Sequence, residues 1–406
     1  MPNNLPLNWC VKSFKDSFVS ISPAYKVKQK EYNEFGSYPI IDQGEEFIGG
    51  YTDSNKGLIS DIPIIAFGDH TRRFKYIDFA FIAGADGLKI YKPIYTDVKF
   101  SYYQCLSLDF PNKGYARHNA LLQKCDFKIP PLAEQERIVE KIEVLFAGID
   151  EGVERLKSAQ AQIKQYRQSV LKSAFEQCKH KGTINDIAQL TKIGPFGSLL
   201  HKSDYVKNGI PLVNPSHIKN LTILPNKDIC VLPLKLKQLQ SYVLKRYDIV
   251  IGRRGEMGRC AVVDEQQEGW LCGTGSMFLR LKKENYPYFY ALYIASQQCI
   301  QYLERNAMGT TMKNLNEKII KKVPIPLPTL HEQQRIVEEI EKRFAVADVL
   351  EKAVNDGLEK VDKLKQSILK KAFEGKLVPQ NPNDEPASIL LERIKKSQTP
   401  TKGKKK

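Results

Sequence analysis

A ten-residue phrase occurs twice in this chain. EQERIVEKIE at residues 134–143 returns as EQQRIVEEIE at residues 332–341, with the two starts 198 residues apart. With that offset held and no gap, residues 134–176 match residues 332–374 at 18 of 43 positions, and the identities gather at the two ends. An internal repeat restricts the possible folds strongly, because both copies must take the same local structure.

Between the matching ends of the repeat, an apolar residue recurs every seven positions. A seven-residue apolar period predicts a long helix with a coiled-coil seam. Prolines stand directly before both copies, where they suit a helix start, and each helix should run about 45 residues or about 65 Å. Leu145, Phe146 and Tyr166 in the first copy, and Phe344, Leu350 and Leu364 in the second, are expected to widen the stripe. The predicted seam residues are Ile142, Ile149, Leu156, Ile163 and Val170, and then Ile340, Ala347, Val354, Val361 and Ile368.

The two predicted helices divide the chain into two globular blocks, each followed by a long helix. Apolar runs such as IPIIAF, FAFIAG, YDIVIG and MFLRL, punctuated by glycine and proline, predict many short strands in both blocks. The fold class we predict is therefore α+β. The predicted segments are a mixed α/β domain at 1–127, a helical region at 128–178, a second mixed domain at 179–327, a second helical region at 328–378, and a short helix with a basic tail at 379–406.

Charge and cysteine usage narrow the class of protein. The net charge of +16 indicates a polyanionic partner, and 22 Lys and Arg against 11 Asp and Glu place most of the excess in residues 179–322. Residues 1–127 are near neutral, at 15 against 14, which weakens the same argument for the first block. Eight scattered cysteines without a CxxC pair predict free thiols in a reducing cytoplasm. The chain has neither a signal pattern nor an uninterrupted apolar stretch of 18 residues, so we expect a soluble intracellular protein with no membrane partner.

A search for an active site finds no motif that supports one. The six histidines form no HExxH motif, and the chain has no GxxxxGK[ST] loop and no GxGxxG at a strand-to-helix junction. NPSH at residues 214–217 faintly resembles a methyltransferase corner, but a loop turn is the better interpretation. We therefore predict no catalytic residues and no metal site.

Two basic stretches are candidates for reading DNA. In FGDHTRRFK, residues 67–75, a strand-end loop would offer His70, Thr71, Arg72, Arg73 and Lys75 to phosphates and base edges, and Lys89 follows in GADGLK. Arginine is the specific tool, because its guanidinium can grip guanine O6 and N7 together. A solvated polar loop remains the alternative interpretation.

The second stretch is IGRRGEMGR, residues 251–259, which follows a strand-like run. Arg253, Arg254 and Arg259 stand among glycines whose backbone can approach a ligand closely. Later in the same block, AMGTTMKNL adds further groups of the kind that position phosphates, namely Thr310, Thr311, Lys313 and Asn314. The alternative is that Glu256 neutralises one of these arginines in a structural loop.

The order of these parts resembles the specificity (S) subunit of type I restriction–modification systems. The likeness rests on IPPLAEQERIVEKIE, on PIPLPTLHEQQRIVEEIE and on the closing AFEGKLVPQNPNDEPASILLERI, and it covers nearly the whole chain. It implies two target recognition domains separated by two long helices, which can pair antiparallel as a coiled coil in a pseudo-two-fold internal repeat. The two blocks resemble different subclasses of recognition domain, which implies two different half-sites.

The resemblance also implies the partners. The chain would bind a bipartite, asymmetric target in double-stranded DNA, while two methyltransferase (M) subunits and, in the full complex, restriction (R) subunits carry out catalysis. S-adenosylmethionine, ATP and Mg²⁺ would be used by those partners. The chain itself would be prokaryotic and cytoplasmic and would bind no cofactor. Two alternatives stay open: a single-chain DNA methyltransferase or nuclease with degenerate motifs, and a coiled-coil scaffold.

Overall fold

The chain folds into two compact units. The computed structural model describes residues 5–85, 87–111, 116–224, 226–308 and 314–398. One unit is Met1–Arg155 with Asp356–Lys406, and the other is Leu156–Asn355. Each unit therefore combines one globular domain with part of both long helices, whereas the predicted segments gave each long helix a region of its own.

No helix among the described residues is both long and apolar enough to cross a membrane.

Two four-stranded sheets form the globular part of the first unit. One has the order β2-β9-β6-β7 and is antiparallel, and the other has the order β4-β3-β8-β5 with β3 and β8 parallel. The strands are β2 (Phe18–Ile21), β9 (Leu88–Pro93), β6 (Ile64–Gly68), β7 (Phe74–Ile77), β4 (Gly50–Thr52), β3 (Tyr38–Ile41), β8 (Phe81–Ala83) and β5 (Leu58–Ile59). The short helices are α1 (Phe14–Ser17), η1 (Gln29–Glu31), α2 (Val98–Leu106) and α3 (Asn119–Leu122).

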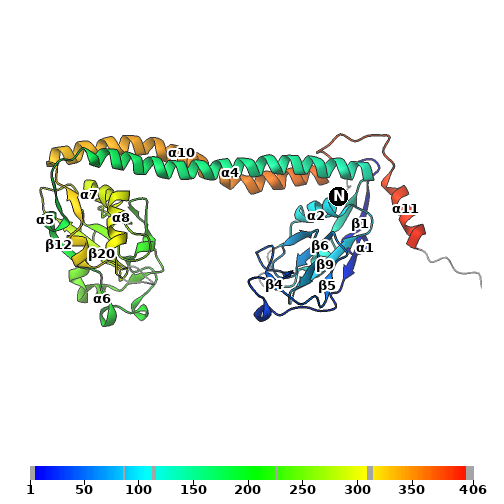
Figure 1. The fold of residues 1–406 in the computed structure, drawn as a ribbon, viewed down its shortest axis with the longest axis horizontal. Helices are drawn as coiled ribbons and strands as arrows, with labels where there is room; N and C mark the ends of the chain where they lie inside the picture. Colours follow the sequence, from blue (N-terminus) through cyan, green and yellow to red (C-terminus); the bar gives the residue numbers. More distant parts are fainter. Residues whose placement is uncertain (1–4, 86, 112–115, 225, 309–313, 399–406) are drawn as a thin grey trace, which may run out of the picture. The chain divides into compact units, whose positions relative to one another are not determined.

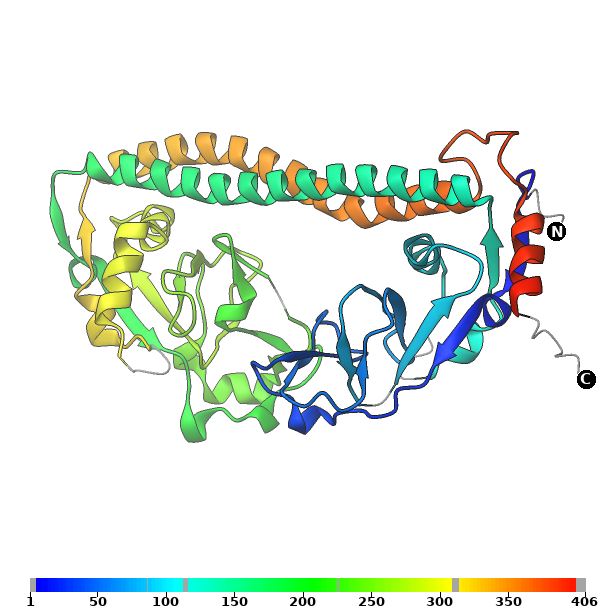
Figure 2. The ribbon, with the colours of Figure 1, turned by 45° about the vertical axis from the view of Figure 1, so that its right-hand side comes forward.

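The two ends of this domain meet in a two-stranded ribbon. β1 (Cys10–Ser13) pairs antiparallel with β10 (Asp126–Ile129), which leads directly into the first long helix. Behind the ribbon lies an aromatic core in which the rings of Phe14 and Phe18 stack with centroids 4.0 Å apart. The C-terminal helix α11 (Ala387–Gln398), red in Figure 2, lies beside this domain. Its residues Ala387 and Leu391 pack into the same core. The predicted short helix after the second long helix is thus part of the first domain's packing.

The second unit repeats this plan with a different sequence. Its antiparallel sheet has the order β12-β20-β17-β18, and a second sheet has the order β16-β13-β19 with β13 and β19 parallel. The strands are β12 (Ala188–Ile193), β20 (Ser276–Leu281), β17 (Ile249–Gly252), β18 (Cys260–Val262), β16 (Cys230–Val231), β13 (Ile210–Val213), β19 (Leu271–Cys272), and the small hairpin β14 (Ile218–Lys219) and β15 (Thr222–Ile223). The ribbon is β11 (Lys181–Thr183) with β21 (Pro324–Pro326), and the helices are α5 (Ile184–Ile187), α6 (Pro233–Gln238), α7 (Pro287–Ile294), α8 (Gln297–Asn306) and α9 (Glu317–Lys321). Four 3-10 turns complete the unit: η2 (Gly197–Leu199), η3 (Lys202–Asp204), η4 (Pro215–His217) and η5 (Gln240–Tyr242).

The predicted long helices are α4 (Leu132–Glu176, 45 residues) and α10 (Leu330–Phe373, 44 residues). In each unit the two helices lie side by side and antiparallel (Figure 1). Asp150 contacts Lys365, Gln160 contacts Asn355 and Arg167 contacts Asp348, so the residue number increases along one helix as it decreases along the other. All ten predicted seam residues are buried or half-buried. The expected widening of the stripe is wrong at Tyr166, Leu350 and Leu364, which are 44%, 52% and 51% exposed. Two paired helices bury only a narrow a/d seam, so positions beside it stay in water.

Matched ion pairs join the helices in the two units. Asp150 and Asp348 are the only identical residues in the middle of the repeat. Lys365 Nζ lies 2.6 Å from Asp150 Oδ1 in the first unit, and Arg167 Nη2 lies 2.5 Å from Asp348 Oδ1 in the second. Lys365 and Arg167 also hold equivalent positions in the two copies of the repeat, so the same contact is made twice.

Candidate nucleic-acid interface

In the first unit the basic stretch forms the turn between β6 and β7. Thr71 Oγ1 donates to the carbonyl oxygen of Gln43 at 2.7 Å, and the His70 amide donates to Gln43 Oε1 at 3.2 Å. A Cβ on Gly68 would lie 2.1 Å from Thr71 Oγ1, so the turn needs a glycine there. Arg72 has a φ of 62°, in the left-handed region. These contacts hold the loop in one shape, with Thr71 and Arg73 exposed at its tip.

The two arginines of this loop differ in their partners. Arg72 Nη1 donates to the carbonyl oxygen of Phe110 at 3.1 Å, which leaves the rest of its guanidinium for other acceptors. Arg73 Nη2 lies 2.6 Å from Glu45 Oε1, and the side chains of Arg73 and Glu45 are 49% and 79% exposed. An exposed ion pair contributes at most about 1 kcal/mol. A phosphate can therefore compete with Glu45 for Arg73.

Lys75 is buried and supports the fold, whereas the sequence predicts that it is exposed and contacts DNA. Its side chain is 6% exposed, and Nζ donates to the carbonyl oxygens of Asp42 at 2.9 Å and Glu46 at 2.6 Å. Burial is the main cause that lowers the pKa of Lys75. This geometry argues against the predicted DNA contact, because the ammonium already holds the loop after β3. Lys89 lies half-buried in β9, opposite Phe67.

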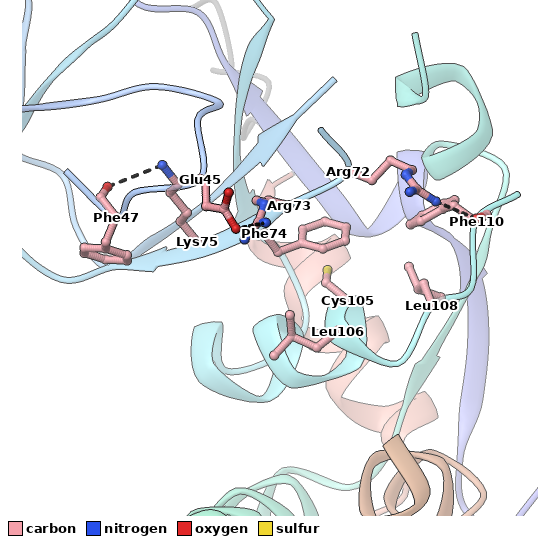
Figure 3. A pocket seen from close by; sticks show the side chains of 10 residues that line it. All are labelled: Glu45, Phe47, Arg72, Arg73, Phe74, Lys75, Cys105, Leu106, Leu108 and Phe110. Atoms are coloured by element: carbon pink, nitrogen blue, oxygen red, sulfur yellow. Dashed lines mark hydrogen bonds and ion pairs between the residues drawn. The ribbon is translucent and has the colours of Figure 1, made fainter. Parts of the chain in front are cut away.

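A cavity of about 370 Å³ opens beside this loop. Figure 3 shows Arg73 with Glu45 on one side of Phe74, and Arg72 with Phe110 on the other. The remaining lining is Phe47, Lys75, Cys105, Leu106 and Leu108. An apolar floor next to guanidinium groups can hold a flat ring by stacking and its phosphate by charge.

In the second unit the three arginines of the cluster have different roles. Arg253 is buried: Nε donates to the carbonyl oxygen of Leu315 at 2.9 Å, and Nη1 reaches that of Thr274 at 3.4 Å. Burial, and then the nearby charge of Arg254, lower the pKa of Arg253. Arg253 therefore ties three loops together, which argues against the direct DNA contact predicted for it.

Arg254 and Arg259 lie nearer the surface. Arg254 is exposed, at the start of the turn after β17. Arg259 Nη2 lies 2.6 Å from Glu256 Oε2, and Nη1 donates to the carbonyl oxygen of Pro215 at 3.0 Å. Arg259 is thus the arginine that Glu256 neutralises, as the alternative interpretation of this loop predicts. Arg254 is left as the strongest candidate of this cluster.

The predicted contact segment near residue 310 meets the same cluster. Thr310, Thr311 and Lys313 lie outside the described residues. Asn314 exchanges backbone hydrogen bonds with Met308 and forms a β-bridge with Arg254. The side-chain Oδ1 of Asn314 is buried, and it has no hydrogen-bond partner among the residues the structure describes.

Sequence reasoning missed two groups of residues at this interface. Gln43 supports the loop of the first unit, and the turn at Asn214–Pro215 supports that of the second. A Cβ on Gly273 would lie 2.2 Å from Asn214 Oδ1, and one on Gly275 would lie 2.9 Å from Pro215 Cδ. NPSH is a turn, as predicted, but it packs against the arginine cluster. Gln43 and Asn214 each follow the end of a buried strand by no more than two residues. A glutamine or asparagine in that position is the only sequence signal that could have predicted both supporting residues.

Corresponding strands position the two sets of loops. In the first unit the contacts come from the loops after β3 and β6, which end at Ile41 and Gly68. In the second they come from the loops after β13 and β17, which end at Val213 and Gly252. Corresponding strand ends thus carry different cations in the two units.

The thiols and acids of the described residues form no metal-binding cluster. No group of three His, Cys, Asp or Glu side chains in this part of the chain is placed to hold a metal ion. Burial raises the pKa of Cys299 to about 12 and raises the pKa values of Cys105, Cys260 and Cys272 as well. These cysteines stay protonated and contribute to packing.

Comparisons with known proteins agree with this arrangement. The family model of the type I restriction modification DNA specificity domain matches residues 6–158 and 179–360. The chain belongs to this family. It is 29% identical over 317 residues to the type I restriction enzyme EcoBI specificity subunit of Escherichia coli, covering 70% of this chain and 67% of that one. It is 31% identical over 309 residues to the EcoKI specificity subunit of Escherichia coli strain K12, covering 68% and 65%.

A solved structure shares the fold of this type I specificity-family chain. It comes from work on the complex assembly and conformational transition of the type I R-M system. At 20% sequence identity the TM-score is 0.67, with 92% of this chain and 100% of that chain covered. That chain therefore has the same fold of mixed α/β domains with a long helix pair.

Proposed function

We propose that this chain is the non-catalytic DNA-reading subunit of a type I restriction–modification complex, and that each unit reads one half of a bipartite, asymmetric duplex target. The observation that carries the proposal is that corresponding strands of the two units carry different cations at their ends: the half-buried Arg72 and the exposed Arg73 in the first unit, and the exposed Arg254 in the second. Two domains with similar strands but different cations at the strand ends suit the recognition of two different half-sites.

The chemistry of these groups fits duplex DNA. A guanidinium can grip guanine O6 and N7 in the major groove, and threonine and amide groups position phosphates. The charge of the second domain supports the same partner, since its excess of cations sits in residues 179–322. Lys75 and Arg253 support the loops from behind and have no contact of their own with DNA in this proposal.

The helix pair is proposed to set the distance between the half-sites. α4 and α10 are each continuous and each contributes to both units, so their length fixes how much unread DNA separates the two readers. We propose that the two helices relate the domains by a pseudo-two-fold axis, as the matched ion pairs of Asp150 and Asp348 support. The spacer would then be selected by geometry alone.

The methyltransferase subunits are proposed to dock on the helix pair. Val346, Val349 and Leu350 of α10 are 59%, 69% and 52% exposed and stand at i, i+3 and i+4, on one helix face. An exposed apolar stripe of this kind marks a protein interface. Two methyltransferase subunits and, in the full complex, restriction subunits would bring S-adenosylmethionine, ATP and Mg²⁺ with them, and this chain would bind none of these.

The test is to sequence modified bases in DNA from cells that contain or lack this chain together with its methyltransferase subunit. We expect a bipartite methylated motif that disappears when this chain is removed. A motif that persists without the chain would overturn the proposal. Methyl transfer from labelled S-adenosylmethionine by the purified chain alone would favour a single-chain methyltransferase instead.

A further inference from the structure

Two glutamines of the repeated phrase hold equivalent positions in the two units. Gln135 is fully buried; its Oε1 accepts from the Asp97 amide at 2.9 Å, and its Nε2 donates to the carbonyl oxygen of Pro130 at 3.0 Å. Gln333, its equivalent in the second copy of the repeat, is 2% exposed. Its Oε1 accepts from the Tyr286 amide at 2.7 Å, and its Nε2 donates to the carbonyl oxygen of Pro328 at 2.9 Å.

The two contacted amides have the same place in their domains. Asp97 is the N-cap residue of α2, and Tyr286 is the N-cap residue of α7. Each glutamine therefore joins the start of one domain helix to the proline that precedes its own long helix.

A second pair of repeated glutamines contacts the other ends of the same domain helices. Gln366 Nε2 of α10 donates to the carbonyl oxygen of Leu106, the last residue of α2, at 3.3 Å. Gln168 of α4 is the equivalent residue in the first copy of the repeat. Its Nε2 donates to the carbonyl oxygen of Ala295, the C-cap residue of α7, at 3.1 Å, and its Oε1 accepts from the Gln297 amide at 2.7 Å.

Aromatic pairs complete the contact between the long helices and the domain helices. Phe373 of α10 meets Phe100 of α2 edge-on, with ring centroids 5.4 Å apart. Phe175 of α4, the equivalent of Phe373 in the first copy, meets Phe289 of α7 edge-on at 5.3 Å. In each unit one long helix holds the N-terminus of the domain helix, while the other holds its C-terminal end and its aromatic face.

We propose that Gln135, Gln366, Gln333 and Gln168, here called the glutamine clamp, set the angle at which each recognition domain leaves the helix pair, and so help select the spacer length of the DNA target. A domain helix held at both ends by two different long helices cannot tilt without breaking a hydrogen bond. The amide suits this task because it donates and accepts at once and carries no charge to desolvate.

The clamp also accounts for where the repeat keeps its identities. Gln135 and Gln333 lie in the phrase that opens the repeat, and Gln168 and Gln366 lie in the phrase that closes it. Between residues 148 and 167 of the first copy, the only residue kept is Asp150, whose equivalent is Asp348, and these two aspartates join the long helices to each other. Four of the identical pairs, namely Gln135 with Gln333, Gln168 with Gln366, Asp150 with Asp348 and Phe175 with Phe373, thus make matched contacts between domain and helix or between helix and helix.

The proposal rests on the proposed function, and its test uses the full chain assembled with its methyltransferase subunits. Gln168→Ala and Gln366→Ala are the chosen variants, because neither side chain is buried and the fold should tolerate their loss. Gln165→Ala is the matched control, an exposed glutamine on α4 that lies one turn earlier. Binding is measured on duplexes that carry the native spacer and spacers one base pair shorter or longer.

We expect the preference for the native spacer to fall about fivefold for each clamp variant, which corresponds to the loss of a hydrogen bond of about 1 kcal/mol. The control should keep the native preference. Duplexes with one half-site alone should bind as tightly as before in every variant. An unchanged preference, or an equal loss of affinity on all spacers, would overturn the proposal.

A second readout does not depend on DNA. In the assembled protein, hydrogen exchange at the Gln297 amide, which donates to Gln168 Oε1, should become faster in Gln168→Ala and stay unchanged in Gln165→Ala. Failure to find a bipartite motif would reject the proposed function. Unchanged exchange would reject the clamp separately.

Discussion

Glu134 and Glu332 hold the same position in the repeated phrase, yet their carboxylates meet opposite surroundings. Glu134 is 2% exposed; one oxygen accepts from Trp9 Nε1 at 2.9 Å, and the other has no partner among the described residues. Burial raises the pKa of Glu134. Glu332 accepts from the amide and the hydroxyl of Thr329, both at 2.8 Å, and these hydrogen bonds lower the pKa of Glu332.

These opposite shifts predict opposite effects of the same substitution. The pKa of Glu134 in the folded protein lies above its value of 4.5 in the unfolded chain. The stability that protonated Glu134 contributes is fully present below pH 4.5 and is lost as the pH rises through the pKa of the folded protein. Ionised Glu134 therefore destabilises the fold at pH 7. Glu134→Gln keeps an acceptor for Trp9 and should raise the melting temperature at pH 7, with the gain disappearing below pH 4.5. A lowered folded pKa works in reverse, so Glu332→Gln should lower the melting temperature at pH 7 and lose that effect in acid. Thermal unfolding from pH 3 to pH 8 checks both signs, and shifts of equal sign would contradict the argument.

Arg253 and Arg254 are adjacent, but only one of them faces solvent. Arg254→Ala should weaken duplex binding by about 1–3 kcal/mol and leave the melting temperature nearly unchanged, because the side chain is exposed. Arg253→Ala should lower the free energy of unfolding by about 1–3 kcal/mol, since the carbonyl oxygens of Leu315 and Thr274 lose a buried donor. Salt titration of DNA binding, paired with thermal unfolding, separates the two roles. A loss of stability in Arg254→Ala would count against this assignment.

At the scale of elements, the sequence predicts periodic features well. The seven-residue period predicts both long helices, and its ten apolar positions are buried or half-buried, because burial in a coiled coil follows from spacing along one chain. Tyr166, Leu350 and Leu364 are exposed although they are apolar. Their exposure depends on the number of helices in the bundle, because a pair of helices buries only the a/d positions. The roles of Lys75 and Arg253 depend on backbone carbonyl groups far along the chain, which neither composition nor motif reveals. Gln43 was missed for the same reason.

The exposed stripe on α10 gives a prediction at this scale. Val349→Asp should change the free energy of unfolding of the chain by no more than about 0.5 kcal/mol, because Val349 is 69% exposed. Binding of the methyltransferase subunit should weaken strongly, since a buried unpaired carboxylate would face an apolar partner. Glu359→Lys, which changes the charge of α10 at an exposed position more than two turns beyond the stripe, should bind normally. Calorimetric titration with the methyltransferase subunit provides the measurement, and equal binding by both variants would exclude the stripe as a docking surface.

At the scale of the whole molecule, the helix pair predicts how the target changes when its length changes. Seven residues inserted after Arg155 in α4, with seven more inserted before Asp356 in α10, keep both seams in phase. They lengthen each helix by about 10.5 Å, which is close to the rise of three base pairs. The preferred spacer should therefore lengthen by about three base pairs, while both half-sites stay the same because no reading loop is altered. Insertion in α4 alone should lower stability instead, since the two seams then fall out of register. Modified-base sequencing reads the half-sites and the spacer together, and a native spacer retained by the doubly extended chain would show that something other than the helices sets the distance.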